Sequence, residues 1–137
     1  MQSKKLSFLF LPALVLVMAV CGALAQSQKT AHANIPFDFW IGGNRLPAGD
    51  YVIEHLESTS YLYFRNMDGK SAQDVYTLPM DDVAAKDGES QLVFELRNAN
   101  HYLYGGWGPF GRRVVVSESS RPAPAGENRA VVPIEFR

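Results

Sequence analysis

Apolar and polar residues alternate with a period of two along most of the chain after residue 30. This period is typical of strands with one buried face, and no stretch of ten residues carries a helical stripe. The first run predicts a strand at 33–41. Its buried face would carry Ala33, Ile35, Phe37, Phe39 and Ile41. Because Pro36 has no N–H to donate, we expect this strand to lie at a sheet edge or to contain a bulge.

The same alternation predicts later strands at 51–56, 61–65, 71–78, 91–97, 101–104, 112–117 and 130–136. Turn sequences separate them, including Asp68-Gly69 after 61–65 and Asn98-Ala99-Asn100 after 91–97, and both are typical of hairpins. Hairpins imply antiparallel pairing. We therefore predict an all-β fold, a small antiparallel β-sandwich or barrel of about seven to eight short strands.

Three stretches break the alternation. The polar run 79–89 is predicted to be a loop, and the glycine-rich run 105–111 to be a turn between strands. An alternative function for 105–111 is to present Trp107 and Phe110 to a partner. The Ser-, Pro-, Ala- and Gly-rich run 119–128 is predicted to be mobile.

The beginning of the chain has the pattern of a secretory signal peptide. A Lys-Lys pair precedes an uncharged apolar run at 6–20, and an Ala-Leu-Ala tripeptide ends at Ala25. We predict a signal peptide at 1–25 and one mature all-β domain at 26–137. The mature domain would be exported to the periplasm or the extracellular space, with no stable membrane span.

Two alternatives to cleavage stay open. The run 6–25 is long enough to remain as a membrane anchor. Cys21 follows an apolar stretch, as a lipid-attached cysteine does, although bulky Val20 stands where such sites have a small residue. Since Cys21 is the one cysteine of the chain, the mature domain would have no disulfide and would rely on its hydrophobic core.

The charge balance argues against a nucleic-acid partner. The chain has 13 basic and 14 acidic residues, a formal net charge of −1. Removing Lys4 and Lys5 with the signal peptide leaves 11 basic residues, 13 minus 2, so the mature domain is mildly acidic. A nucleic-acid binder normally carries a basic surface.

The opening of the mature chain has a distinctive motif. It reads IPFDF at 35–39, then Gly42, then LPAGDY at 46–51. It resembles the "PFxF…LPAGxY" opening of a family of small exported acidobacterial-type β proteins, which continue with a central Asp-Gly hairpin and a late Trp strand followed by Gly-Arg. The matching later residues here are Asp68-Gly69, Trp107 and Gly111-Arg112. The resemblance implies a compact β domain and carries over no catalytic residue.

Catalytic and cofactor motifs are absent from the sequence. It has no G-x-S-x-G elbow, no phosphate-binding loop with Lys and no H-E-x-x-H. His55 and His101 lie on predicted strands and could meet, but Glu54 would point to the opposite face from His55. The acidic run 81–89 lacks the spacing of a calcium loop. We predict no catalytic residue, no metal and no cofactor.

Aromatic side chains are the candidate binding residues. The chain is 12% aromatic, and tyrosines alternate with core-like residues in 61–64 and 101–104. If both tyrosine pairs face outward on neighbouring strands, they form a flat platform for a protein or glycan partner. The alternative is that one tyrosine row completes the core between two sheets. The candidates are Tyr61, Tyr63, Tyr102, Tyr104 and Trp107.

The function predicted from these features is an exported, non-enzymatic β domain acting as a binding or structural module in the envelope or outside the cell. One alternative is a barrel that carries a small apolar ligand, which requires an interior apolar cavity of several hundred Å³. Another is a hydrolase with an unrecognised carboxylate site, which requires titratable groups converging in a cleft.

Overall fold

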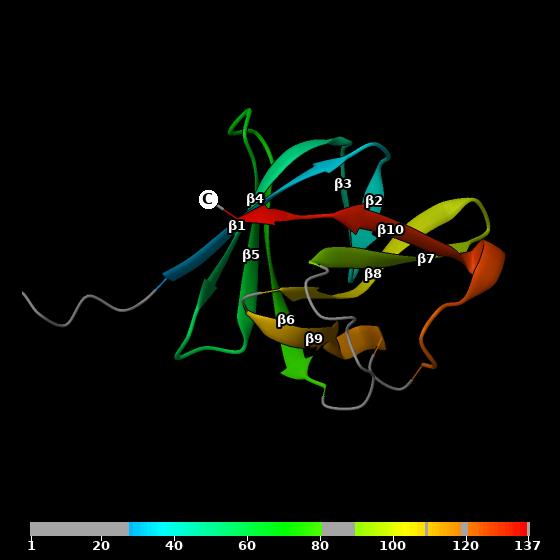
Figure 1. The fold of residues 1–137 in the computed structure, drawn as a ribbon. Helices are drawn as coiled ribbons and strands as arrows, with labels where there is room; N and C mark the ends of the chain where they lie inside the picture. Colours follow the sequence, from blue (N-terminus) through cyan, green and yellow to red (C-terminus); the bar gives the residue numbers. More distant parts are fainter. Residues whose placement is uncertain (1–27, 81–89, 109, 119–120, 137) are drawn as a thin grey trace, which may run out of the picture.

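The computed structural model describes residues 28–80, 90–108, 110–118 and 121–136, and in them the chain is all β, as predicted (Figure 1). These residues form eleven strands, more than the seven to eight expected. The strands are β1 (Gln28–Ile35), β2 (Phe39–Ile41), β3 (Asn44–Leu46), β4 (Gly49–Leu56), β5 (Tyr61–Asn66), β6 (Ala72–Pro79), β7 (Gln91–Arg97), β8 (Asn100–Gly108), β9 (Gly111–Val115), β10 (Arg129–Pro133) and β11 (Glu135–Phe136). Two 3₁₀ turns, η1 (Val116–Glu118) and η2 (Gly126–Asn128), lie between β9 and β10.

The strands form a strongly curled sheet. Its hydrogen-bonded order is β10-β7-β8-β9-β6-β5-β4-β1-β11, with β2 and β3 attached beside β8. The first and last strands of this path are consecutive in the chain and are separated only by Ile134. In Figure 1 this red C-terminal segment runs from β7, which pairs with β10, to β1, which pairs with β11. The same short segment therefore joins the two ends of the sheet.

A second strand also has two partners in succession. The first part of β6, 72–76, pairs with β5, and its last part, 77–79, pairs with β9. The fold is thus two half-sheets connected at one side through β6 and at the other through β10 and β11. Large side chains from both halves fill the space between them, so the fold combines features of a sandwich and a barrel.

The predicted strand at 33–41 is wrong in one respect, because it is two strands. β1 pairs with β4 and β11, whereas β2 pairs with β3 and, in parallel, with β8. Pro36 has no N–H, and Asp38 turns its carboxylate back to accept bonds from the Ala48 N–H (2.9 Å) and Arg45 (2.7 Å). These interactions favour a bend after β1. Phe39 is buried as expected, but Phe37 is only half-buried.

The prediction of a turn at 105–111 is wrong for its first part, because residues 105–108 belong to β8, and β8 pairs with β9 from Gly108 and Gly111 onward. The glycines are needed for close strand packing. A Cβ on Gly105 would lie 2.2 Å from the Arg113 carbonyl oxygen, and one on Gly106 would lie 2.9 Å from that of Gln91. Phe110 is buried rather than presented to solvent.

The core between the half-sheets is aromatic. Phe39, Tyr51, Phe64 and Phe94 are fully buried, and the Phe39 ring meets Tyr51 and Phe94 edge to face at 5.2 and 5.5 Å. Each such side chain contributes roughly 1.5–3 kcal/mol through burial. The LPAGDY motif has a structural role here, since the Tyr51 hydroxyl donates to the Pro47 carbonyl at 2.6 Å.

The outer face of β7, β8 and β9 is covered as well. Val93, Tyr104 and Val114 form a second buried cluster on this face, and Ala123 and Pro124, in the described part of the segment between η1 and β10, line the pocket beside it. Of the predicted mobile run 119–128, residues 119–120 lie outside the described residues, and Pro124 is buried. Strand β7 therefore has buried residues on both faces, with the aromatic core on one side and the second cluster on the other. This explains why Gln91 through Phe94 are all buried, without alternation.

The predicted signal peptide and most of the loop predicted at 79–89 lie outside the described residues. Within the described residues no helix has the length and apolar character needed to cross a membrane.

Candidate functional site

Two of the candidate tyrosines lie side by side on the outside of β5. Tyr61 is 39% exposed and Tyr63 is 36% exposed, while Leu62 and Phe64 between and after them are buried. The alternation read from the sequence therefore places this tyrosine pair correctly. The two ring centroids are 6.4 Å apart and the planes are tilted by 34°.

A third tyrosine, which was not among the candidates, completes this surface. Tyr76 lies directly opposite Tyr61 in the β5–β6 hairpin and is 45% exposed. Its ring meets Tyr61 edge to face at 5.2 Å and 70°. This pairing could have been predicted from the Asp68-Gly69 turn, because a hairpin turn determines which residues of its two strands lie opposite each other. We call Tyr61, Tyr63 and Tyr76 the tyrosine face.

Charged groups border the tyrosine face at Tyr63. Asp74 is opposite Tyr63 on β6, and Glu54 is opposite it on β4. The Arg65 guanidinium is bound to the Glu54 carboxylate at 2.8 Å. A shallow depression of about 290 Å³ lies among these groups. The surface therefore combines exposed aromatic area with a polar rim.

Tyr102 lies elsewhere. β5 and β8 are not neighbours, because β6 and β9 stand between them in the sheet. Tyr102 is half-buried, stacks on Trp40 with ring centroids 6.2 Å apart, and has the Arg97 guanidinium carbon 3.8 Å above its ring. The single platform that required both tyrosine pairs on neighbouring strands is not formed.

Tyr104 is a buried structural residue. Its side chain belongs to the cluster on the outer face of β8, and its hydroxyl donates to the Arg121 carbonyl at 3.2 Å. Burial raises the pKa of this hydroxyl above its ordinary value. For Tyr104 the alternative interpretation, a row that completes buried packing, is the one that fits its surroundings.

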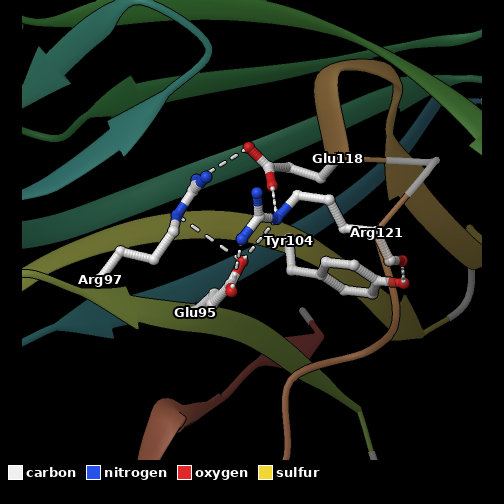
Figure 2. Close-up of polar contacts among 5 residues, drawn as sticks. All are labelled: Glu95, Arg97, Tyr104, Glu118 and Arg121. Atoms are coloured by element: carbon white, nitrogen blue, oxygen red, sulfur yellow. Dashed lines mark hydrogen bonds and ion pairs between the residues drawn. The ribbon is translucent and has the colours of Figure 1, made fainter.

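A network of four charges fixes the same segment to β7 (Figure 2). Arg121 donates two bonds to the Glu95 carboxylate, at 3.0 and 3.2 Å. Arg97 donates to Glu118 at 2.9 Å, and Arg121 lies 3.4 Å from the other Glu118 oxygen. The network attaches the chain after β9 to strand β7. Because it contains two positive and two negative charges, it has no net charge with which to bind a ligand.

Trp107 lies at the edge of the second cluster and is half-buried. The guanidinium carbons of Arg112 and Arg129 are 5.5 and 5.9 Å from the centroid of its ring. A pocket of about 80 Å³ lies beside it. Trp107 is therefore separate from the tyrosine face.

The two strand histidines do not meet. His55 is buried beside Phe110, and its Nε2 donates to the Thr59 carbonyl at 3.0 Å. His101 stacks on Phe37 with ring centroids 3.7 Å apart. Burial is the main cause that lowers the pKa of both imidazoles. Among the described residues no group of three His, Cys, Asp or Glu side chains is arranged to hold a metal ion.

A pocket of about 400 Å³ is lined in part by titratable groups. His32 on β1 is opposite Glu135 on β11, and Asp50 accepts a hydrogen bond from Asn34 at 2.7 Å. This pocket is where the hydrolase alternative would place its carboxylates.

No family, no curated protein and no solved structure matches this chain.

Proposed function

We propose that this chain is an exported, non-enzymatic binding module and that the tyrosine face is its contact surface. The observation that carries the proposal is the exposure of three tyrosines on one face of the β5–β6 hairpin, where the Tyr61 ring contacts both the Tyr63 ring and the Tyr76 ring. Tyrosine is enriched at protein interfaces because it offers a large rigid area with a polar tip.

A protein partner fits the tyrosine face better than a stacked sugar. The rings of Tyr61 and Tyr76 stand at 70° to each other, and those of Tyr61 and Tyr63 at 34°. A sugar ring needs a flat aromatic surface, whereas a protein surface can fill the angle between rings. The polar rim of Asp74 and the Glu54–Arg65 ion pair is typical of the border of a protein interface.

The sequence at 1–25 supports export, and the packed core supports a domain that needs no disulfide. The core also weakens the carrier alternative, since Phe39, Tyr51 and Phe94 occupy the centre of the space that an internal ligand would need. The hydrolase alternative depends on Asp50 and Glu135 in the pocket of about 400 Å³.

The test uses the exported protein as bait for proteins of its own cell envelope. We expect Tyr61→Ala with Tyr76→Ala to abolish capture of the specific partner. Val131→Ala, which changes an exposed apolar residue on β10, is the matched control and should leave capture unchanged. Capture that survives loss of both tyrosines would refute the proposal. Binding only to a glycan array would change the partner class, and hydrolysis lost with Asp50→Asn would favour the enzyme alternative.

A further inference from the structure

Trp107 is flanked by two arginines that have no carboxylate partner in the described part of the chain. Arg112 is opposite Trp107 in the β8–β9 pair, and Arg129 approaches the same ring from the start of β10. Each guanidinium lies within the range at which an indole attracts a cation. Two like charges held around one ring create a local excess of positive charge.

The nearby carboxylates are already committed to other arginines. Glu95 binds Arg121 through two bonds, and Glu118 binds Arg97. The charge excess at Arg112 and Arg129 is therefore not balanced by the network beside it.

Two hydrogen-bond donors at this place also lack acceptors. Arg112 Nη1 and Trp107 Nε1 are shielded from solvent, and neither donates to an acceptor among the residues that the structure describes. Buried donors in folded proteins are almost always satisfied, because an unpaired one loses its hydration without replacement. Both residues line the pocket of about 80 Å³. A hydrogen-bond acceptor inside this pocket can reach the two donors once the lining side chains move slightly.

The remaining walls of the pocket are mostly apolar. The apolar lining residues are Met80, Val93, Ala123 and Pro124, and Tyr104, Gly106 and Arg113 also line the pocket. The Arg113 guanidinium already donates to the Phe110 carbonyl at 3.3 Å and to the Thr77 hydroxyl at 3.1 Å. One water needs about 10–15 Å³ on this scale, so a pocket of about 80 Å³ admits a handful of non-hydrogen atoms. Met80 has a flexible side chain that can adapt to such a group. The pocket thus combines an anion-binding end with an apolar end.

We infer that this pocket binds a small organic carboxylate. The carboxylate accepts hydrogen bonds from the Arg112 guanidinium and the Trp107 indole, Arg129 supplies further positive charge, and a short branched apolar body packs on Met80 and Val93. An inorganic anion would fill only the charged end. The site lies apart from the tyrosine face and does not depend on its function.

The experiment uses isobutyrate as the probe and follows the two indole N–H resonances of the exported protein by NMR. Trp107 is the reporter, and Trp40, which stacks on Tyr102, is the internal control. Isobutyrate should shift the Trp107 resonance in a saturable way and leave Trp40 unmoved. Isobutyramide, which has the same shape without the charge, should bind at least about tenfold more weakly.

Variants assign the contacts. Arg112→Gln and Arg129→Gln should each raise the dissociation constant about tenfold or more, since each removes a charged partner. Arg45→Gln, an exposed arginine paired with Asp38, should leave it unchanged. Equal binding of isobutyramide, or unchanged affinity in both pocket variants, would overturn the inference.

A further variant asks whether the chain supplies the anion itself. Asp81 and Asp82 follow Met80 in sequence and lie outside the described residues. The inference expects isobutyrate to bind Asp81→Asn with Asp82→Asn at least as tightly as it binds the unchanged protein. The inference is overturned by two results together. In the first, the Trp107 resonance of the ligand-free double variant differs from that of the unchanged protein. In the second, adding isobutyrate moves this resonance in neither protein.

Discussion

Tyr61 and Tyr76 lie directly opposite each other on β5 and β6, with their ring centroids 5.2 Å apart and both rings open to solvent. On the inner side of the same hairpin, Leu62 and Val75 are opposite each other and buried. The hairpin therefore separates two roles by alternation alone. Its inner residues stabilise the core, and its outer residues form the surface proposed to bind a partner.

The first prediction concerns the separation of these roles. Tyr61→Ala and Tyr76→Ala should each change the free energy of unfolding by less than about 1 kcal/mol, because they remove exposed pair contacts. Phe64→Ala, on the inner face of β5, should cost about 3–5 kcal/mol. Urea denaturation of the three variants measures this. A tyrosine variant as unstable as Phe64→Ala would make the tyrosine face a structural feature.

The charge network of Figure 2 should contribute measurably to stability. Glu118→Gln removes the charged partner of Arg97 at a carboxylate whose side chain is only 10% exposed. We expect a loss of about 1.5–3 kcal/mol in the free energy of unfolding. Lys29→Gln, which breaks an ion pair between side chains 39% and 48% exposed, is the control and should cost less than about 1 kcal/mol. Equal effects of the two changes would show that the network does not fix the η1 segment.

Gly105 tests the close approach of β8 and β9. Gly105→Ala places a Cβ 2.2 Å from a backbone oxygen that cannot move without shifting β9. The variant should lose at least about 2–3 kcal/mol of stability. Gly43→Ala, where an added Cβ meets nothing within 4 Å, should remain within about 1 kcal/mol of the unchanged protein. A stable Gly105→Ala protein would contradict the extended strand.

His55 makes stability depend on pH. Burial lowers its folded-state pKa below the ordinary value of 6.5, so below that pH the unfolded chain binds a proton more readily than the folded one. The stabilisation from His55 is therefore complete at pH values above the ordinary pKa. It is lost as the pH falls from the ordinary pKa towards the lower folded-state pKa. Urea midpoints measured from about pH 7.5 to about pH 5.5 should fall less steeply for His55→Gln than for the unchanged protein. Parallel curves would show that His55 is not responsible.

The sequence was sufficient where the determining interactions are local. Alternation and the Asp68-Gly69 turn place Tyr61 and Tyr63 outside and Leu62 inside, and β7 has the predicted bounds. The errors arise where strands change partners. β1 and β2 read as one strand because their buried faces are in phase, and Gly105 reads as a turn because only the neighbouring strand shows why a glycine is needed.

The prediction that the two tyrosine pairs lie together failed for the same reason, because the sequence does not show which strands are neighbours in the sheet. Nothing local to Tyr102 or Tyr104 indicates that β6 and β9 separate β8 from β5. Burial of Tyr104 also depends on the segment after β9, which Arg121 and Glu95 hold in place from positions far apart in sequence. Tyr76, by contrast, followed from the hairpin register and could have been found.

The central claim, binding through the tyrosine face, is tested most directly by photo-crosslinking in the cells that produce the protein. Photo-reactive benzoylphenylalanine replaces Tyr63 in one variant and Val131, an exposed residue on β10, in another. The account predicts one defined protein adduct from position 63 and none from position 131. No adduct from position 63, or the same adduct from both positions, would contradict it.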